Sequence, residues 1–116
     1  MSAFEQKLIE SGLESVRKSQ SAKDSVEAWR YCQVALMQFV QARWIDPKNW
    51  VAHYCEGEIL KNLGLLSEAA DRLHAVIEIN PGFIPAYRSL GMVRMEQAAE
   101  LFQRTGCKLY EPDKVL

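Results

Sequence analysis

The chain lacks the apolar runs and the charge imbalance that define several classes of protein. Its 116 residues contain no uninterrupted apolar run of about 18, so we expect no transmembrane helix. The first residues carry glutamates and no apolar run after a basic start, unlike a secretory signal. The net charge is −1, and the basic cluster of Arg17, Lys18 and Lys23 is short and flanked by acids. We therefore predict neither membrane insertion nor a nucleic-acid partner.

Sequence signals of covalent chemistry are also scarce. The three cysteines, Cys32, Cys55 and Cys107, show no CxxC spacing, which is typical of free thiols in a reducing cytoplasm. The phosphate-binding motifs GxxxxGK[ST] and GxGxxG and the nucleophile motif GxSxG are absent. We therefore predict a cytoplasmic protein that is not an enzyme and that uses no cofactor or metal.

A remote enzymatic alternative rests on His53, Cys55 and Glu56. The pairs His53 with Glu56 and His74 with Glu78 have the spacing of part of a metal site. Adjacent helical residues diverge by about 100°, however, so His53, Cys55 and Glu56 cannot converge on one side of a helix. The simpler interpretation is that His53 packs as an aromatic residue and that Cys55 is a small filler. For Glu56 we expect weak local packing, with a polar contact specific to this protein as the alternative.

Helical periodicity is what the chain does contain. Between residues 50 and 81, apolar residues recur at helical spacing in two runs separated by residues 62–64. Gly64 can adopt a left-handed conformation and end the first helix. Ser67 can cap the second helix. Pro81 then ends it, because proline disfavours a helical conformation in the residue before it.

The same landmarks recur at an interval of 34 residues. Small residues and prolines are paired at this interval in Ala35 and Ala69, Pro47 and Pro81, Ala52 and Ala86, and Gly57 and Gly91. Agreement of several such positions at one interval indicates an internal repeat of two-helix units.

This 34-residue helix–turn–helix pattern resembles the tetratricopeptide repeat. Residues 50–81 resemble one full repeat, whose small, turn and closing positions match Gly57, Gly64, Ala69 and Pro81. Residues 33–47 resemble the second helix of a preceding repeat, and residues 84–91 resemble the first helix of a following one. Two residues depart from the family: His53 stands in place of an aromatic residue, and Glu56 in place of a large apolar one. Ala98 occupies the place of the next turn glycine, so we expect the last helix to continue.

The resemblance implies an all-α, tetratricopeptide-like domain of about five helices over residues 1–116. We expect an N-terminal helix over about 3–18, with an apolar stripe of Phe4, Leu8, Ile9, Leu13 and Val16. The repeat-like core spans about 25–95 and is followed by a helical extension to about 104, which Gly106 ends. Residues 107–116 form a tail.

Two helices carry specific predictions about burial. The segment 25–45 has one apolar stripe that includes Trp29 and Trp44 and a second stripe on another side, and a helix that is apolar on two sides is buried between neighbours. If both tryptophans lie inside, truncating either to alanine costs about 3–5 kcal/mol. In the last helix, the residues expected to face the core are Tyr87, Leu90, Gly91 and Val93.

The resemblance also implies where a partner binds, because stacked repeats form a concave surface lined by the first helix of each repeat. Carried over residue by residue, this surface consists of Val51, Tyr54, Glu58, Lys61, Arg88, Met92 and Met95. One subtype of the family holds a terminal carboxylate with lysine, arginine and asparagine side chains. Only Arg88 suits that role here, which argues against a carboxylate-clamp co-chaperone of heat-shock proteins.

We therefore predict a non-catalytic protein- or peptide-binding module that acts as an adaptor, co-chaperone or assembly subunit. Two alternatives remain open. One is a homo-oligomeric scaffold such as a homodimer, in which a second copy covers Met95, Leu101 and Phe102. The other is a small secretion-system chaperone that holds an export substrate.

Overall fold

The computed structural model describes residues 2–106, which form five α-helices and no strand. The helices are α1 (Ala3–Gln20), α2 (Ser25–Ile45), α3 (Trp50–Asn62), α4 (Leu66–Ile79) and α5 (Ile84–Thr105). This confirms the prediction of an all-α fold, and the predicted tail lies outside the described residues. No helix within residues 2–106 is long and apolar enough to cross a membrane.

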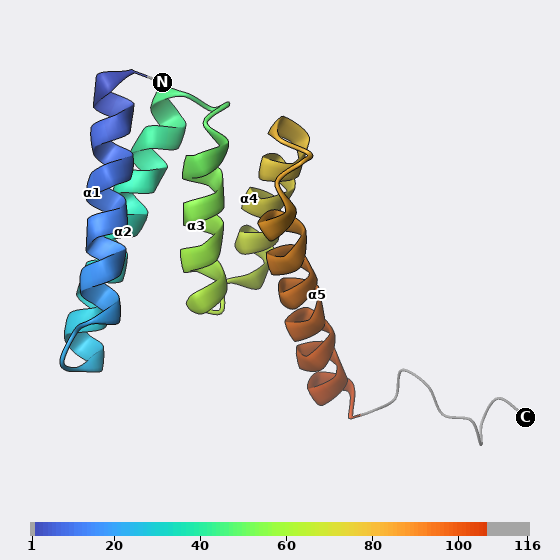
Figure 1. The fold of residues 1–116 in the computed structure, drawn as a ribbon. Coiled ribbons are helices and arrows are strands. Elements are labelled where there is room, and N and C mark those ends of the chain that lie inside the picture. Colours follow the sequence, from blue (N-terminus) through green and yellow to red (C-terminus); the bar gives the residue numbers. More distant parts are fainter. Residues whose placement is uncertain (1, 107–116) are drawn as a thin grey trace, which may run out of the picture.

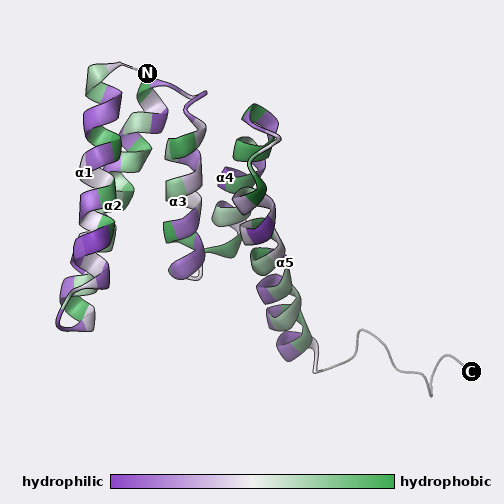
Figure 2. Ribbon diagram, in the orientation of Figure 1, coloured by the Kyte–Doolittle hydropathy of each residue, from purple (hydrophilic) through white to green (hydrophobic). Residues whose placement is uncertain are grey.

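Consecutive helices run in opposite directions and pack in chain order, so that α1 contacts α2, α2 contacts α3, α3 contacts α4, and α4 contacts α5 (Figure 1). Hydrophobic and hydrophilic residues are interspersed along the helices (Figure 2), as expected for helices that bury one face. α3 lies in the middle of this array. The carboxyl-terminal half of α5 extends beyond the ends of α3 and α4.

The beginnings of the helices are set by side chains close in sequence. Ser2 and Glu5 form a reciprocal capping box at α1, in which the Glu5 backbone amide donates to Ser2 Oγ over 3.1 Å. Asp24 caps α2 by accepting from the backbone amide of Glu27. The predicted cap at Ser67 is wrong. The cap position is Leu65, two residues earlier, with no side-chain cap, and α4 begins at Leu66, which is buried.

Two helix ends follow the prediction. Gly64 has φ of 80° just after α3, and Gly106 has φ of 63° at the end of α5. Both angles lie in the left-handed region, where a residue without Cβ carries no steric penalty.

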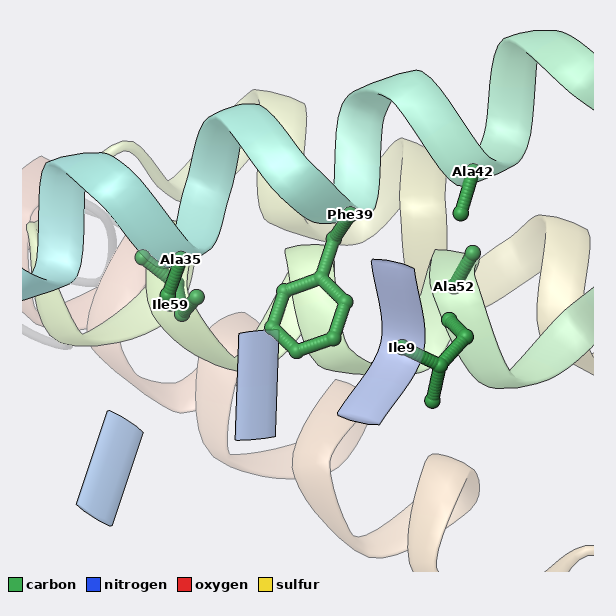
Figure 3. Packing of buried hydrophobic residues seen from close by; sticks show 6 residues of the cluster. All are labelled: Ile9, Ala35, Phe39, Ala42, Ala52 and Ile59. Atoms are coloured by element: carbon green, nitrogen blue, oxygen red, sulfur yellow. The ribbon is translucent and has the colours of Figure 1, made fainter. Parts of the chain in front are cut away.

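The first core cluster lies between α1, α2 and α3 and consists of Ile9, Ala35, Phe39, Ala42, Ala52 and Ile59. Figure 3 shows Phe39 extending from α2 towards the other members of the cluster. The ring of Phe39 is fully buried and occupies the space beside Gly12 of α1, where a Cβ atom would lie 2.6 Å from Phe39 Cζ. Gly12 therefore lets α1 and α2 approach closely.

The second core cluster joins α3, α4 and α5 and consists of Leu60, Leu66, Ala69, Ala70, Leu73 and Val93. Gly57 allows α3 and α4 to approach closely, as Gly12 does for α1 and α2. A Cβ atom at Gly57 would lie 3.2 Å from Leu73 Cγ and 3.3 Å from Arg72 Cβ of α4.

The buried face of α1 differs from the predicted apolar stripe. Ile9 is buried as expected, but Phe4 and Leu13 are 62% and 48% exposed. The other buried positions of α1 hold small or polar residues, namely Glu5, Gly12 and Ser15. Side-chain hydrogen bonds replace apolar contact at two of them, since Glu5 accepts from Asn49 and Ser15 donates to Gln38.

α2 buries only one of its two apolar sides fully, and the prediction that both tryptophans lie inside is wrong. The side with Ala35, Phe39 and Ala42 is fully buried, whereas Trp29 and Trp44 are 55% and 76% exposed. The short alanine side chains allow α1 and α3 to pack closely on the first side. The second side is covered only in part, because Leu36 and Val40 are half-buried and Leu36 packs against both core clusters, whereas the two tryptophans are exposed.

The buried face of α5 also differs from the predicted one. Val93 is fully buried and Leu90 is half-buried, as expected. Tyr87 is 44% exposed and Gly91 is also exposed, so these two do not face the core. The physical reason is that α5 packs on α3 and α4 through one side only.

Candidate functional site

Two adjoining hollows lie beside the carboxyl-terminal end of α3. The first, of about 270 Å³, separates α1 from α3 and is lined by Leu13, Val16, Gln20, Tyr54, Cys55, Glu58, Ile59 and Asn62. The second, of about 330 Å³, lies between α3 and α5 and is lined by Lys61, Asn62, Gly64, Met92 and Glu96. Because Asn62 lines both, we treat the two hollows as one surface and call it the groove.

The groove has a polar centre at Glu58. Lys61 Nζ donates to Glu58 Oε2 over 2.9 Å, and Ser89 Oγ of α5 donates to Glu58 Oε1. Glu58 thereby connects α3 to α5. Burial and the nearby Glu58 carboxylate raise the pKa of the Tyr54 phenol, so Tyr54 enters the groove as a neutral hydrogen-bonding group.

Aromatic contacts fix the position of Tyr54. Its ring lies edge-on to Phe83, with centroids 4.9 Å apart, and Trp50 contacts the same Phe83 ring at 4.6 Å. Phe83 immediately precedes α5. The start of α5 is therefore held against α3, and Tyr54 is a rigid part of the groove wall.

Of the seven predicted groove residues, four line the hollows, one packs on the core and two are exposed outside the hollows. Tyr54 and Glu58 line the first hollow, and Lys61 and Met92 line the second. Val51 packs against the first core cluster. The two remaining residues are solvent-exposed and line neither hollow: Arg88 and Met95.

Sequence reasoning missed the contribution of α1, which supplies Leu13, Val16 and Gln20. The repeat interval could not reveal it. α4 begins at Leu66, and the position 34 residues earlier (66 − 34 = 32) is Cys32, whereas α2 begins at Ser25. The longer α2 displaces α1 from the 34-residue register. The available signal was Leu13, an apolar residue between Gly12 and Glu14.

His53, one of the two departures from the family pattern, has both ring nitrogens in contact with protein groups. His53 Nε2 lies 2.7 Å from the Pro47 carbonyl oxygen, and Nδ1 lies 3.2 Å from an Arg72 guanidinium nitrogen. Arg72 can only donate, so Nδ1 accepts and the Nε2–H group donates to Pro47. Burial, followed by the positive charge of Arg72, lowers the pKa of His53, which favours this neutral form.

Glu56, the second departure, forms an ion pair rather than the weak packing we expected first. Arg43 of α2 donates to it through Nε over 2.7 Å and through a terminal nitrogen over 3.4 Å. The side chains of Glu56 and Arg43 are 6% and 24% exposed. A buried charge needs such a partner, and this one ties α2 to α3.

Cys55 lies in a different environment from both of these residues. It packs against the first core cluster, and burial raises the pKa of its thiol to about 11. Very little thiolate is then present at neutral pH. Within residues 2–106, no group of three or more His, Cys, Asp or Glu side chains has the geometry of a metal site.

A shallower hollow of about 510 Å³ lies on α2 and is lined by Asp24, Val26, Glu27, Arg30, Tyr31 and Val34. These residues belong to one helix and its cap, so the hollow has a single wall. The groove has walls from three helices and is the stronger candidate site.

No protein-family model, no curated protein and no solved structure matches this chain. The geometry of the groove is therefore the basis of the functional argument.

Proposed function

We propose that this chain is a non-catalytic, tetratricopeptide-like binding module that holds an extended segment of a partner protein across α1, α3 and α5. The observation that supports the proposal is the pair of adjoining hollows at the end of α3. Their volumes of about 270 and 330 Å³ are near the lower limit for small-molecule sites, roughly 300 Å³. Two open hollows of this size suit individual side chains of a peptide.

The chemistry of the hollows defines the segment that fits. In the first hollow, Leu13, Val16 and Ile59 form an apolar wall that suits an aliphatic or aromatic side chain. The amide groups of Gln20 and Asn62 can donate to and accept from a peptide backbone.

The second hollow is lined by residues of opposite charge, Lys61 and Glu96, and by Met92. Methionine adapts to irregular partners. We infer a segment with one apolar anchor followed by a polar residue. As an adaptor, co-chaperone or assembly subunit, the module would recognise this pattern on its partner.

A phage-displayed random peptide library tests the proposal. Selected peptides are expected to perturb the NMR amide resonances of α1, α3 and α5 around the groove. Leu13→Arg should weaken their binding at least about tenfold, or 1.4 kcal/mol, because it puts a charge into the apolar hollow.

Val34→Arg is the matched control, because Leu13 and Val34 are 48% and 46% exposed and Val34 lies on α2. Equal loss in both variants, or resonance changes confined to α2, would contradict the groove assignment. Failure to select any peptide would do so as well.

A further inference from the structure

α5 carries an apolar stripe on the side that faces away from α3 and α4. Its members recur at intervals of three or four residues, which places them on one helix face: Ile84, Tyr87, Gly91, Met95, Ala98 and Phe102. The four large side chains are 63%, 44%, 73% and 50% exposed, respectively. We call this set the α5 stripe. It lies outside the groove, since none of its members lines either hollow.

The internal repeat shows that the corresponding face of α3 is covered. Gly57 of α3 and Gly91 of α5 are equivalent at the 34-residue interval. At Gly57, α4 lies close enough that a Cβ atom would be 3.2 Å from Leu73 Cγ. At Gly91, a Cβ atom would meet no atom within 4 Å. The same small position is thus packed in one repeat and open in the other.

We propose that the α5 stripe is the contact surface of a homodimer in which α5 packs antiparallel against α5 of a second copy. A twofold axis near residue 93 brings together positions whose numbers sum to about 186. Ile84 then lies opposite Phe102 of the second copy, and Met95 lies opposite Gly91 of the second copy. Tyr87 likewise lies over Ala98 of the second copy.

Two of these three pairs set a large residue against a small one, and the third joins two large apolar residues at the ends of the stripe. Each contact occurs twice, as in the self-complementary interface of a twofold dimer. A parallel pair would place Met95 against Met95 of the second copy and leave a gap between the two Gly91 positions. The observed pattern of sizes thus selects the antiparallel arrangement.

The available area fits a modest dimer. The stripe from residue 84 to 102 is about 27 Å long at a rise of about 1.5 Å per residue. With roughly 150–250 Å² for a fully exposed large side chain, the four exposed ones supply on the order of 450 Å² per copy. Two copies then bury about 900 Å², which lies in the range below ~1,200 Å² of weak, reversible interfaces.

The charges beside the stripe are compatible with this arrangement. In the antiparallel pair, Arg88 of one copy lies about 15 Å along the helix axis from Arg88 of the other. Arg94 is nearer to the twofold axis, but its guanidinium lies 2.9 Å from His74 Nε2 and donates to Gln97 over 2.8 Å. These contacts direct the Arg94 charge towards α4 and away from the stripe.

Sedimentation equilibrium of the full chain, from micromolar to near-millimolar concentration, tests the proposal. We expect the mass to rise from 13.2 kDa towards twice that value. Met95→Glu should raise the dissociation constant at least about 100-fold, because it places an unpaired charge in a desolvated contact.

Met37→Glu is the matched control, since Met37 and Met95 are 62% and 73% exposed on different helices. It should leave the dissociation constant unchanged. A mass of 13.2 kDa at every concentration would overturn the proposal, and so would an equal effect of the two substitutions. Unchanged circular dichroism of both variants confirms that each has folded.

The orientation is tested by mixing Ile84→Cys with Phe102→Cys, both carrying Cys107→Ser, under oxidation. The antiparallel dimer predicts a disulfide between the two variants, and little self-linking of either, because equal positions at the stripe ends are about 27 Å apart. Self-linked dimers of each variant alone would indicate a parallel pair and overturn the arrangement.

Discussion

Replacing three helical glycines by alanine should change stability in three different ways. In a helix interior, alanine is favoured over glycine by about 0.5–1 kcal/mol through backbone entropy alone. The difference between sites then reports what the new methyl group contacts. Gly91 has no neighbouring atom within 4 Å of a Cβ position, so Gly91→Ala should stabilise the monomer by about 0.5–1 kcal/mol.

Gly12→Ala should have the opposite effect. The added Cβ would lie 2.6 and 2.7 Å from two ring carbons of Phe39, whose side chain is fully buried. Overpacking of this kind costs typically about 1–3 kcal/mol, and the entropy gain offsets part of it. We expect a net loss of roughly 1–2 kcal/mol. Gly57→Ala, with contacts of 3.2–3.3 Å to α4, should lie between the other two.

Urea unfolding followed by far-ultraviolet circular dichroism measures all three variants at one low protein concentration. The slope of free energy against urea should stay constant, so that the midpoint reports stability. The expected order of stability is Gly91→Ala, wild type, Gly12→Ala. If Gly12→Ala were as stable as Gly91→Ala, the close approach of α1 to Phe39 would be refuted.

Four further predictions concern single side chains. Arg43→Met should cost about 3–5 kcal/mol in urea unfolding, because it leaves the Glu56 carboxylate buried without a partner. Glu56→Gln should cost less, since Arg43 can reach solvent; equal costs would contradict this asymmetry. Burial lowers the pKa of His53 from its ordinary value of 6.5. As the pH falls, the imidazole of His53 is therefore protonated in the unfolded chain before it is protonated in the folded protein. The contribution of neutral His53 to stability is complete above about pH 6.5 and is lost progressively as the pH falls below that value. His53→Gln should therefore reduce the slope of the free energy of unfolding against pH. Trp44→Ala should change stability by less than about 1 kcal/mol, and a loss of about 3–5 kcal/mol would show that Trp44 is covered. With its pKa near 11 against an ordinary 9.0, Cys55 should react about 100-fold more slowly with a thiol reagent in the native protein than in urea; equal rates would contradict its burial.

Local signals in the sequence predicted much of the fold. Helical spacing and the breakers near residues 64, 81 and 106 gave five helices whose ends agree closely with the structure. The 34-residue interval identified Gly57 and Gly91 as equivalent positions before any packing was known. Helical spacing and helix breakers depend on neighbours within one or two helical turns, and the interval is visible because similar residues recur along the chain.

The groove was predicted in part for the same reason. Tyr54 and Glu58 were found because they lie on the central helix, where the repeat pattern is complete. Leu13 was missed because the length of α2 moves α1 out of register. Glu56 could not be paired with Arg43 in advance, since the two residues are 13 positions apart on different helices.

The sequence by itself determined the helical content and most of the helix boundaries, because backbone propensity and capping act over a few residues. The tertiary structure alone decided which of two apolar sides is buried. On α2 the alanine side packs inside and Trp44 remains outside, and on α5 the Gly91 side stays open where the Gly57 side of α3 is closed. Burial depends on which helix comes to lie against a face, and apolar composition does not specify that neighbour.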